Sequence, residues 1–236
     1  MHHPVVYLAF ANDPSAPLPM LTEEAQQLEH IFRRVSDTHI QLGKDEFATL
    51  DTIADKLRHF GQQLQVLHYA GHADSRRLLL PDGPADGSGM AQLISAAGPQ
   101  LVFLNGCSTH GQVRLLLELG TPAVIATSRP IGDKMATEVA AQFFQGLCAG
   151  MTIGAAFQAV EGYLAAKKQP ALLRRMRGVD FEEGTGADSV PPWGIYYEKE
   201  EALAWTLPET QESGKTIQQS AEKIYNIGNI DKADFS

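Results

Sequence analysis

Short runs of apolar residues alternate along this chain with longer segments in which apolar residues recur every three or four positions. Apolar runs of strand length lie within residues 5–12, 64–73, 100–110 and 121–127. Helical spacing relates Leu28, Ile31, Phe32 and Val35 in one segment, and Leu50, Ile53, Ala54, Leu57 and Phe60 in another. Alternating strands and helices predict an α/β fold, with a mainly parallel central sheet and helices on both of its faces.

The rest of the pattern predicts shorter elements around this framework. A short second strand is expected at 39–43, and residues 76–87 are typical of a hairpin that turns on Asp82 and Gly83. Further helices are expected at 89–99, 110–120, 133–150 and 152–168. Residues 169–190 lose periodicity, which indicates a mobile, partly helical excursion, and residues 191–207 then return as one or two strands.

The chain is predicted to divide at Pro208. A length of 236 residues with 44% hydrophobic content fits one substantial core, which we assign to a domain of residues 1–208. Residues 209–236 are polar and have no helical apolar face, so we expect a flexible, disordered C-terminal tail.

Charge and composition argue against several classes of partner and cofactor. The net charge is −9 and the basic residues are scattered, apart from Arg174, Arg175 and Arg177, so a nucleic-acid partner is not expected. No apolar stretch approaches the roughly 20 residues that span a bilayer, which favours a cytoplasmic protein without a membrane partner. Neither a complete phosphate-binding loop nor metal-ligand spacing is present, so no cofactor and no metal are expected.

Two strand ends carry residues suited to nucleophilic catalysis. His72 and Cys107 each follow an apolar strand, in the small-residue turns AGHA and NGCS. Because working groups in open α/β sheets lie just past the carboxyl ends of parallel strands, we expect these side chains to meet as base and nucleophile. His68 lies deeper on the same strand and is expected to pack, and His110 is a weaker alternative base. Cys148 lies in a helical run and is expected in the core.

These two turns, together with the segment PAVIATSRPIGDKMATEVAAQFF that follows them, resemble the CHAT family of caspase-like domains. The resemblance spans roughly residues 5–207 and implies a caspase-like three-layer α/β/α sandwich that acts on a protein substrate as a cysteine peptidase. It implies a dyad in which Cys107 attacks the peptide carbonyl and His72 transfers the proton. The backbone N–H groups of Cys107 and Ala73 are then expected to form the oxyanion hole.

Two residues are candidates for the S1 pocket, which holds the substrate side chain (P1) next to the cleaved bond. Asp133 lies where related peptidases of the separase type carry an acidic S1 residue, which implies a basic P1 side chain. Arg129 resembles instead the S1 arginine of caspases, which implies an acidic P1 side chain. The alternative role of Asp133 is that of a helix N-terminal cap.

The tail contains an uncharged, proline-free segment that is rich in strand formers. Within residues 218–236 this cross-β signature comprises Ile224, Asn226, Ile227, Gly228 and Ile230. The segment resembles the core of RHIM-like amyloid signalling motifs, which bacteria place on cell-death effectors and on NLR-like NTPase sensors. This implies self-assembly through the tail or assembly with such a sensor. A disordered tail or an edge strand of the domain is the alternative.

Together these observations favour a caspase-like cysteine endopeptidase with a Cys-His dyad. We expect it to act as an effector of a bacterial immune or programmed cell-death pathway, activated by tail-mediated assembly. One alternative is a catalytically silent caspase-like adaptor that assembles through its tail. Another is a small α/β hydrolase or amidotransferase with a cysteine nucleophile.

Overall fold

A seven-stranded sheet forms the middle of the computed structural model, which describes residues 3–36, 40–169, 173–177 and 191–208. The strands are β1 (Val5–Ala11), β2 (Gln41–Asp45), β3 (Leu64–Gly71), β6 (Leu101–Asn105), β7 (Ala123–Thr127), β8 (Leu173–Arg177) and β9 (Trp193–Tyr197). Their order across the sheet is β2-β1-β3-β6-β7-β9-β8. Every neighbouring pair runs parallel except β7 and β9, which confirms the predicted, mainly parallel sheet.

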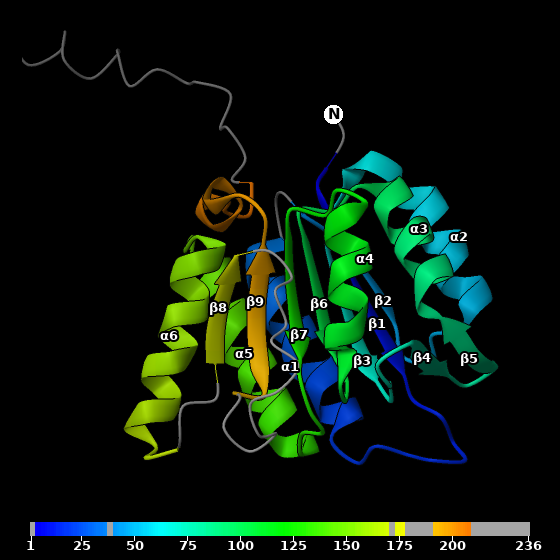
Figure 1. The fold of residues 1–236 in the computed structure, drawn as a ribbon, viewed down its shortest axis with the longest axis horizontal. Helices are drawn as coiled ribbons and strands as arrows, with labels where there is room; N and C mark the ends of the chain where they lie inside the picture. Colours follow the sequence, from blue (N-terminus) through cyan, green and yellow to red (C-terminus); the bar gives the residue numbers. More distant parts are fainter. Residues whose placement is uncertain (1–2, 37–39, 170–172, 178–190, 209–236) are drawn as a thin grey trace, which may run out of the picture.

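Helices cover both faces of this sheet (Figure 1). Their bounds are α1 (Leu21–Ser36), α2 (Leu50–Phe60), α3 (Gly87–Ala97), α4 (Val113–Glu118), α5 (Asp133–Cys148) and α6 (Ile153–Ala166). Residues of α1, α5 and α6 pack on one face, and residues of α2, α3 and α4 pack on the other. The predicted three-layer α/β/α sandwich is therefore confirmed.

Strand β1 shows why the strands of this sheet are continuously apolar. Side chains alternate across a strand, so Val6 and Phe10 enter the core beneath α1 and α5, while Val5 and Tyr7 enter the core on the opposite face. Because helices cover both faces, neither set of positions can be polar. All seven residues of β1 are buried.

The predicted hairpin forms a small sheet of its own. Strands β4 (Arg77–Leu80) and β5 (Gly83–Asp86) run antiparallel, with Leu80 opposite Gly83. The two residues between the strands are Pro81 and Asp82, one position earlier than the predicted turn.

Two predictions for the second half of the chain need correction, and the one or two strands expected at 191–207 are confirmed. Within 169–190, the described part is not helical, because 173–177 form β8, whose partner β9 lies far along the sequence. Residues 191–207 hold a single strand, β9, followed by the 3₁₀ helix η3 (Glu200–Ala204). The helix expected at 110–120 begins as the 3₁₀ helix η2 (Thr109–Gln112) and continues as the six-residue α4.

Candidate active site

His72 and Cys107 leave two neighbouring parallel strands at the same level. Strand β3 pairs with β6, and Ala70 stands opposite Asn105 in the register. His72 and Cys107 each lie two residues beyond that pair, as 72 − 70 and 107 − 105 are both 2. The topology therefore brings together the two residues that the sequence singles out.

The close approach of these strand ends depends on Gly106. A Cβ atom at this position would lie 2.7 Å from the carbonyl oxygen of Gly71 and 3.0 Å from the Cβ of Ala73. Real Cβ atoms do not approach a backbone oxygen so closely, so a larger residue must push the two strand ends apart. The glycine thus keeps the turn of Cys107 against the turn of His72.

The turn that carries Cys107 is held by neighbouring threonines. Thr127, at the end of β7, donates its hydroxyl to the carbonyl of Gly106, and its backbone N–H donates to Thr109 Oγ1 at 3.0 Å. Thr109 Oγ1 in turn donates to the carbonyl of Leu104 at 3.1 Å. Ser108 adopts the left-handed conformation, with φ 55° and ψ 34°, which non-glycine residues rarely adopt. A fixed, strained turn next to a candidate nucleophile is typical of functional sites.

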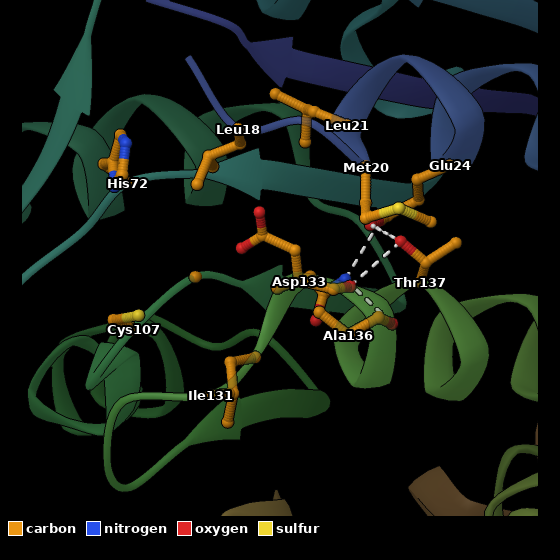
Figure 2. Close-up of a pocket in the computed structure, with 13 residues that line it drawn as sticks. Leu18, Met20, Leu21, Glu24, His72, Cys107, Ile131, Asp133, Ala136 and Thr137 are labelled. Atoms are coloured by element: carbon orange, nitrogen blue, oxygen red, sulfur yellow. Dashed lines mark hydrogen bonds between the residues drawn. The ribbon is translucent and has the colours of Figure 1, made fainter. Parts of the chain in front are cut away.

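Both side chains line one cleft (Figure 2). The cleft is lined by Leu18, Met20, Leu21, Glu24, Gly71, His72, Asn105, Gly106, Cys107, Ile131, Asp133, Ala136 and Thr137. Cys107 and His72 are partly exposed, so a substrate can reach them. The lining comes from the segment before α1, from α1 itself, from the ends of β3 and β6, and from the start of α5.

A backbone carbonyl orients the imidazole of His72. Nε2 of His72 lies 2.9 Å from the carbonyl oxygen of Ala16, in the segment between β1 and α1. A carbonyl only accepts hydrogen bonds, so Nε2 must carry the proton and donate it. Nδ1 of the neutral ring then keeps the lone pair that a general base needs. Sequence reasoning missed this partner, because a backbone carbonyl leaves no signature in a sequence.

The two predicted oxyanion donors are backbone N–H groups outside the sheet ladders. Ala73 faces Leu78 across an isolated antiparallel bridge, whose hydrogen bonds run from Leu79 N to His72 O and from Asp74 N to Arg77 O, each at 2.9 Å. This pattern leaves the N–H of Ala73 out of the bridge. Among the described residues, the N–H of Ala73 and that of Cys107 have no hydrogen-bond acceptor.

A buried carboxylate, Glu24, lies at the other end of the cleft. Its side chain is 3% exposed, and its Oε1 lies 2.8 Å from His68 Nε2 and accepts from Asn105 Nδ2 at 2.9 Å. Its Oε2 accepts from the hydroxyl of Thr137 at 3.4 Å. These hydrogen bonds join α1 to β3, β6 and α5, and Figure 2 shows Glu24 and Thr137 across the cleft from His72 and Cys107.

Sequence reasoning also missed Glu24, although a signal was present. The buried face of α1 contains Leu21, Ala25 and Leu28, and Glu24 falls on that face at helical spacing. A carboxylate in an apolar stripe predicts a buried partner or a functional site. His68, expected to pack, is fully buried among the rings of Phe10, Phe103 and Phe144 and is also a partner of that carboxylate.

The structure brings Asp133 to the cleft and corrects its proposed capping role. The N-cap of α5 is Gly132, and Asp133 is the first residue of the helix, without a side-chain cap bond. Its partly exposed carboxylate lines the cleft between the dyad residues and Glu24 (Figure 2). Arg129 is not among the described residues that line this cleft.

The other candidate side chains differ in environment from the dyad residues. Cys148 packs against the core at the end of α5, and burial raises the pKa of its thiol to about 12, so it stays protonated at neutral pH. Burial, and then the charge of Arg174, lowers the pKa of His110. The assembly residues Ile224, Asn226, Ile227, Gly228 and Ile230 lie outside the described residues.

Neither a metal centre nor a membrane span is found in the described part of the chain. No group of three or more histidine, cysteine and acidic side chains in these residues is arranged to hold a metal ion. None of the helices described above is both long enough and apolar enough to cross a bilayer.

Comparison with known families and structures gives a consistent fold assignment. The sequence pattern of the CHAT domain matches residues 3–213, and no curated protein matches the chain. The chain is similar in structure to the Arg-specific cysteine proteinase gingipain R, with a TM-score of 0.57 and 14% identity over 87% of this chain and 48% of that one. A complex of the pro- and mature domains of the Porphyromonas gingivalis gingipain is also similar. Its TM-score is 0.56 and its identity 15%, over 88% of this chain and 49% of that one.

A secreted C11 cysteine protease from Bacteroides thetaiotaomicron, solved with an irreversible peptide inhibitor, is also similar. The TM-score is 0.53 and the identity 11%, over 72% of this chain and 61% of that one. The chain thus spans about half the length of the gingipain chains. At these identities the likeness concerns the fold, and it confirms the predicted caspase-like architecture.

Proposed function

The chain belongs to the CHAT domain family, and from this premise we propose that it is a cysteine endopeptidase with a dyad of Cys107 and His72. One observation carries the proposal: the two side chains lie at the same level beyond neighbouring parallel strands and line one cleft. A nucleophile and a base that share a cleft are the minimum for covalent catalysis of acyl transfer.

The geometry supports a two-stage mechanism. Cys107 attacks the peptide carbonyl carbon while His72 Nδ1 takes the thiol proton, and the carbonyl oxygen becomes an oxyanion held by the N–H groups of Cys107 and Ala73. The C–N bond then breaks, and the amine leaves with the proton from His72. A water molecule hydrolyses the resulting thioester, with His72 taking its proton and returning it to the Cys107 thiolate. The Ala16 carbonyl holds the Nε2–H of His72 through both stages.

A peptide probe with a thiol-reactive group tests this proposal. The parent chain should be labelled at Cys107, and the label should be absent from the Cys107→Ala chain. Labelling at Cys148 instead, or none under conditions that activate the chain, contradicts the peptidase and favours a silent adaptor.

We further propose that Asp133 favours a basic P1 side chain, since its carboxylate lines the cleft near the dyad. Asp133→Asn removes the charge and keeps the shape of the side chain. We expect kcat/KM for peptides with P1 Lys or Arg to fall about 10- to 100-fold, because a charge-assisted hydrogen bond is worth roughly 1.5–3 kcal/mol. Peptides with P1 norleucine should be cleaved as by the parent.

Arg129→Gln is the matched variant for the opposite assignment. If P1 Asp peptides are the preferred substrates and Arg129→Gln removes that preference, the S1 pocket binds an acidic side chain through Arg129. Asp133 then does not determine the P1 preference. Rates on P1 Lys peptides measured for the two variants in parallel decide between these residues.

We also propose that the chain is an effector of a bacterial immune or cell-death pathway and that tail assembly activates it. The sequence of Ile224, Asn226, Ile227, Gly228 and Ile230 supports this, since stacked strands of such a segment raise the local concentration of the attached peptidase. The matching strand belongs to an NLR-like NTPase sensor or to further copies of this chain.

Ile227→Asp is expected to block activation, because one unpaired charge recurs in every layer of the stack. Assembly is followed by thioflavin fluorescence of the isolated tail, and activity by sensor-triggered proteolysis with the full chain. Cys107→Ala is the control that should assemble without cutting. If Ile227→Asp is triggered as readily as the parent, activation does not pass through the tail.

A further inference from the structure

The cleft ends on a buried carboxylate that has no lysine or arginine partner in the described residues. Glu24 is 3% exposed, and none of the ion pairs formed by described lysine and arginine side chains includes it. A buried carboxylate without a counter-ion is costly unless hydrogen bonds or a ligand compensate it. Because Glu24 also lines the cleft that contains Cys107, a ligand can supply the missing charge.

The hydrogen-bond partners of Glu24 are neutral donors. His68 is fully buried, and its Nδ1 has no hydrogen-bond partner among the described residues. A second proton on this ring would therefore leave a buried N–H unpaired, so His68 acts as a neutral donor through Nε2. Asn105 and Thr137 supply the other two hydrogen bonds and no charge. The negative charge of Glu24 thus remains available to a cation in the cleft.

Asn105 adds a second acceptor beside this carboxylate. Its Nδ2 donates to Glu24 Oε1 at 2.9 Å and to the carbonyl of Ala136 at 3.2 Å. Both partners are acceptors. With the amide reversed, Oδ1 would face the Glu24 carboxylate and the Ala136 carbonyl without a proton between them, so the orientation of the amide is fixed. Oδ1 of Asn105, a residue 4% exposed, is consequently an acceptor without a donor in the described part of the chain.

We propose that Glu24 and Asn105 form the floor of the S1 pocket and bind the cationic end of a P1 lysine or arginine. The inference rests on the proposed peptidase function. It adds the residues that bind the far end of the substrate side chain. Ammonium and guanidinium groups carry several N–H donors and no acceptor, which matches a floor of acceptors. Leu21 and Ile131 line the path to this floor and suit the aliphatic stem.

This arrangement gives the two carboxylates of the cleft different tasks. Asp133 is partly exposed and lies nearer the dyad, whereas Glu24 is buried and lies deeper (Figure 2). Asp133 attracts the cation at the wall of the pocket, and Glu24 selects a side chain long enough to reach the floor. His68 and Thr137 are positioning residues, since they hold the Glu24 carboxylate and do not touch the substrate.

Glu24→Gln tests the proposal in the full chain that also carries Cys107→Ala, so that peptides bind without being cleaved. Glutamine keeps an oxygen for His68 and Asn105, and its amide can donate to Thr137 Oγ1, so the fold should be retained. We expect calorimetric binding of peptides with P1 Lys or Arg to weaken about 10- to 100-fold, and binding of the P1 norleucine peptide to stay unchanged. Equal binding of the basic peptides by both chains overturns the inference.

Glu23→Gln is the matched control, since it removes the same charge one residue earlier in α1. Glu23 is exposed and accepts a hydrogen bond from Gln27 on the helix surface. This variant should bind all peptides as the Cys107→Ala chain does. If it weakens P1 Lys binding as much as Glu24→Gln, the effect is one of overall charge and the floor assignment is wrong.

Substrate length gives a second test that needs no substitution in the pocket. A P1 ornithine, one methylene shorter than lysine, should bind the Cys107→Ala chain clearly more weakly than P1 Lys, because its ammonium stops short of the floor. Equal binding of the two peptides contradicts a contact between Glu24 and the P1 ammonium group. Asp133 would then be the sole acidic residue that determines the P1 preference. If Cys107 is not labelled but peptide binding still depends on Glu24, the proposed peptidase function is wrong and the assignment of the pocket floor stands.

Discussion

Replacing Cys107 with alanine is expected to abolish peptide cleavage, with a loss in kcat of about 10⁴-fold or more. His72→Ala should cost as much, because a dyad whose members act in one step loses its function when either is removed. Both side chains are partly exposed and lie beyond the strand ends. The free energy of unfolding of each variant should therefore lie within about 1 kcal/mol of the parent value. The measurement is turnover of a fluorogenic peptide, together with a urea unfolding curve for each chain.

Cys148→Ala and His110→Ala are the controls for this experiment. Burial keeps the Cys148 thiol protonated at neutral pH, so its removal should leave turnover unchanged at a modest cost in stability. His110 lies in η2, beyond the turn of Cys107, and its variant should keep most of the activity. Loss of turnover in Cys148→Ala with full activity in Cys107→Ala would place the nucleophile elsewhere.

The framework of this fold was predictable because its signals are local. Continuous apolar runs marked β1, β3, β6 and β7, since each of these strands is buried on both faces. The parallel order then placed the ends of β3 and β6 together, which brought His72 and Cys107 to one cleft. Strand β8 was not predictable in this way, because only two of the five residues of its LRRMR segment are apolar and it lies at the sheet edge.

The interior of the cleft depends on contacts between distant parts of the chain. Glu24 receives hydrogen bonds from residues 44, 81 and 113 positions away, so its place on the apolar face of α1 indicates burial but does not identify these partners. Asp133 illustrates the converse: an acidic residue at a helix start resembles a cap in sequence, but Gly132 occupies that position. The Ala16 carbonyl that orients His72 belongs to the backbone and cannot be inferred from residue type.

Gly106→Ala is expected to lower kcat/KM about 100-fold, although it adds only a methyl group. The new Cβ would lie 2.7 Å from the backbone oxygen of Gly71, which cannot swing away as a side chain could. The ends of β3 and β6 must therefore separate, and Cys107 moves relative to His72. Misplacement of a reacting group by about 1 Å can cost roughly 10²-fold in rate, and overpacking of this kind costs about 1–3 kcal/mol of unfolding free energy.

Gly89→Ala is the matched substitution for Gly106→Ala. Gly89 lies in α3 with no atom within 4 Å of the position of a Cβ, so alanine there should raise the unfolding free energy by roughly 0.5–1 kcal/mol and leave turnover unchanged. The informative comparison is between rate and stability at 25 °C, where both chains remain folded. A Gly106→Ala chain with parental kcat/KM and reduced stability would show that the glycine serves packing alone. A chain that loses rate while its fold is intact would tie the spacing of the two strand ends to the chemistry of Cys107 and His72.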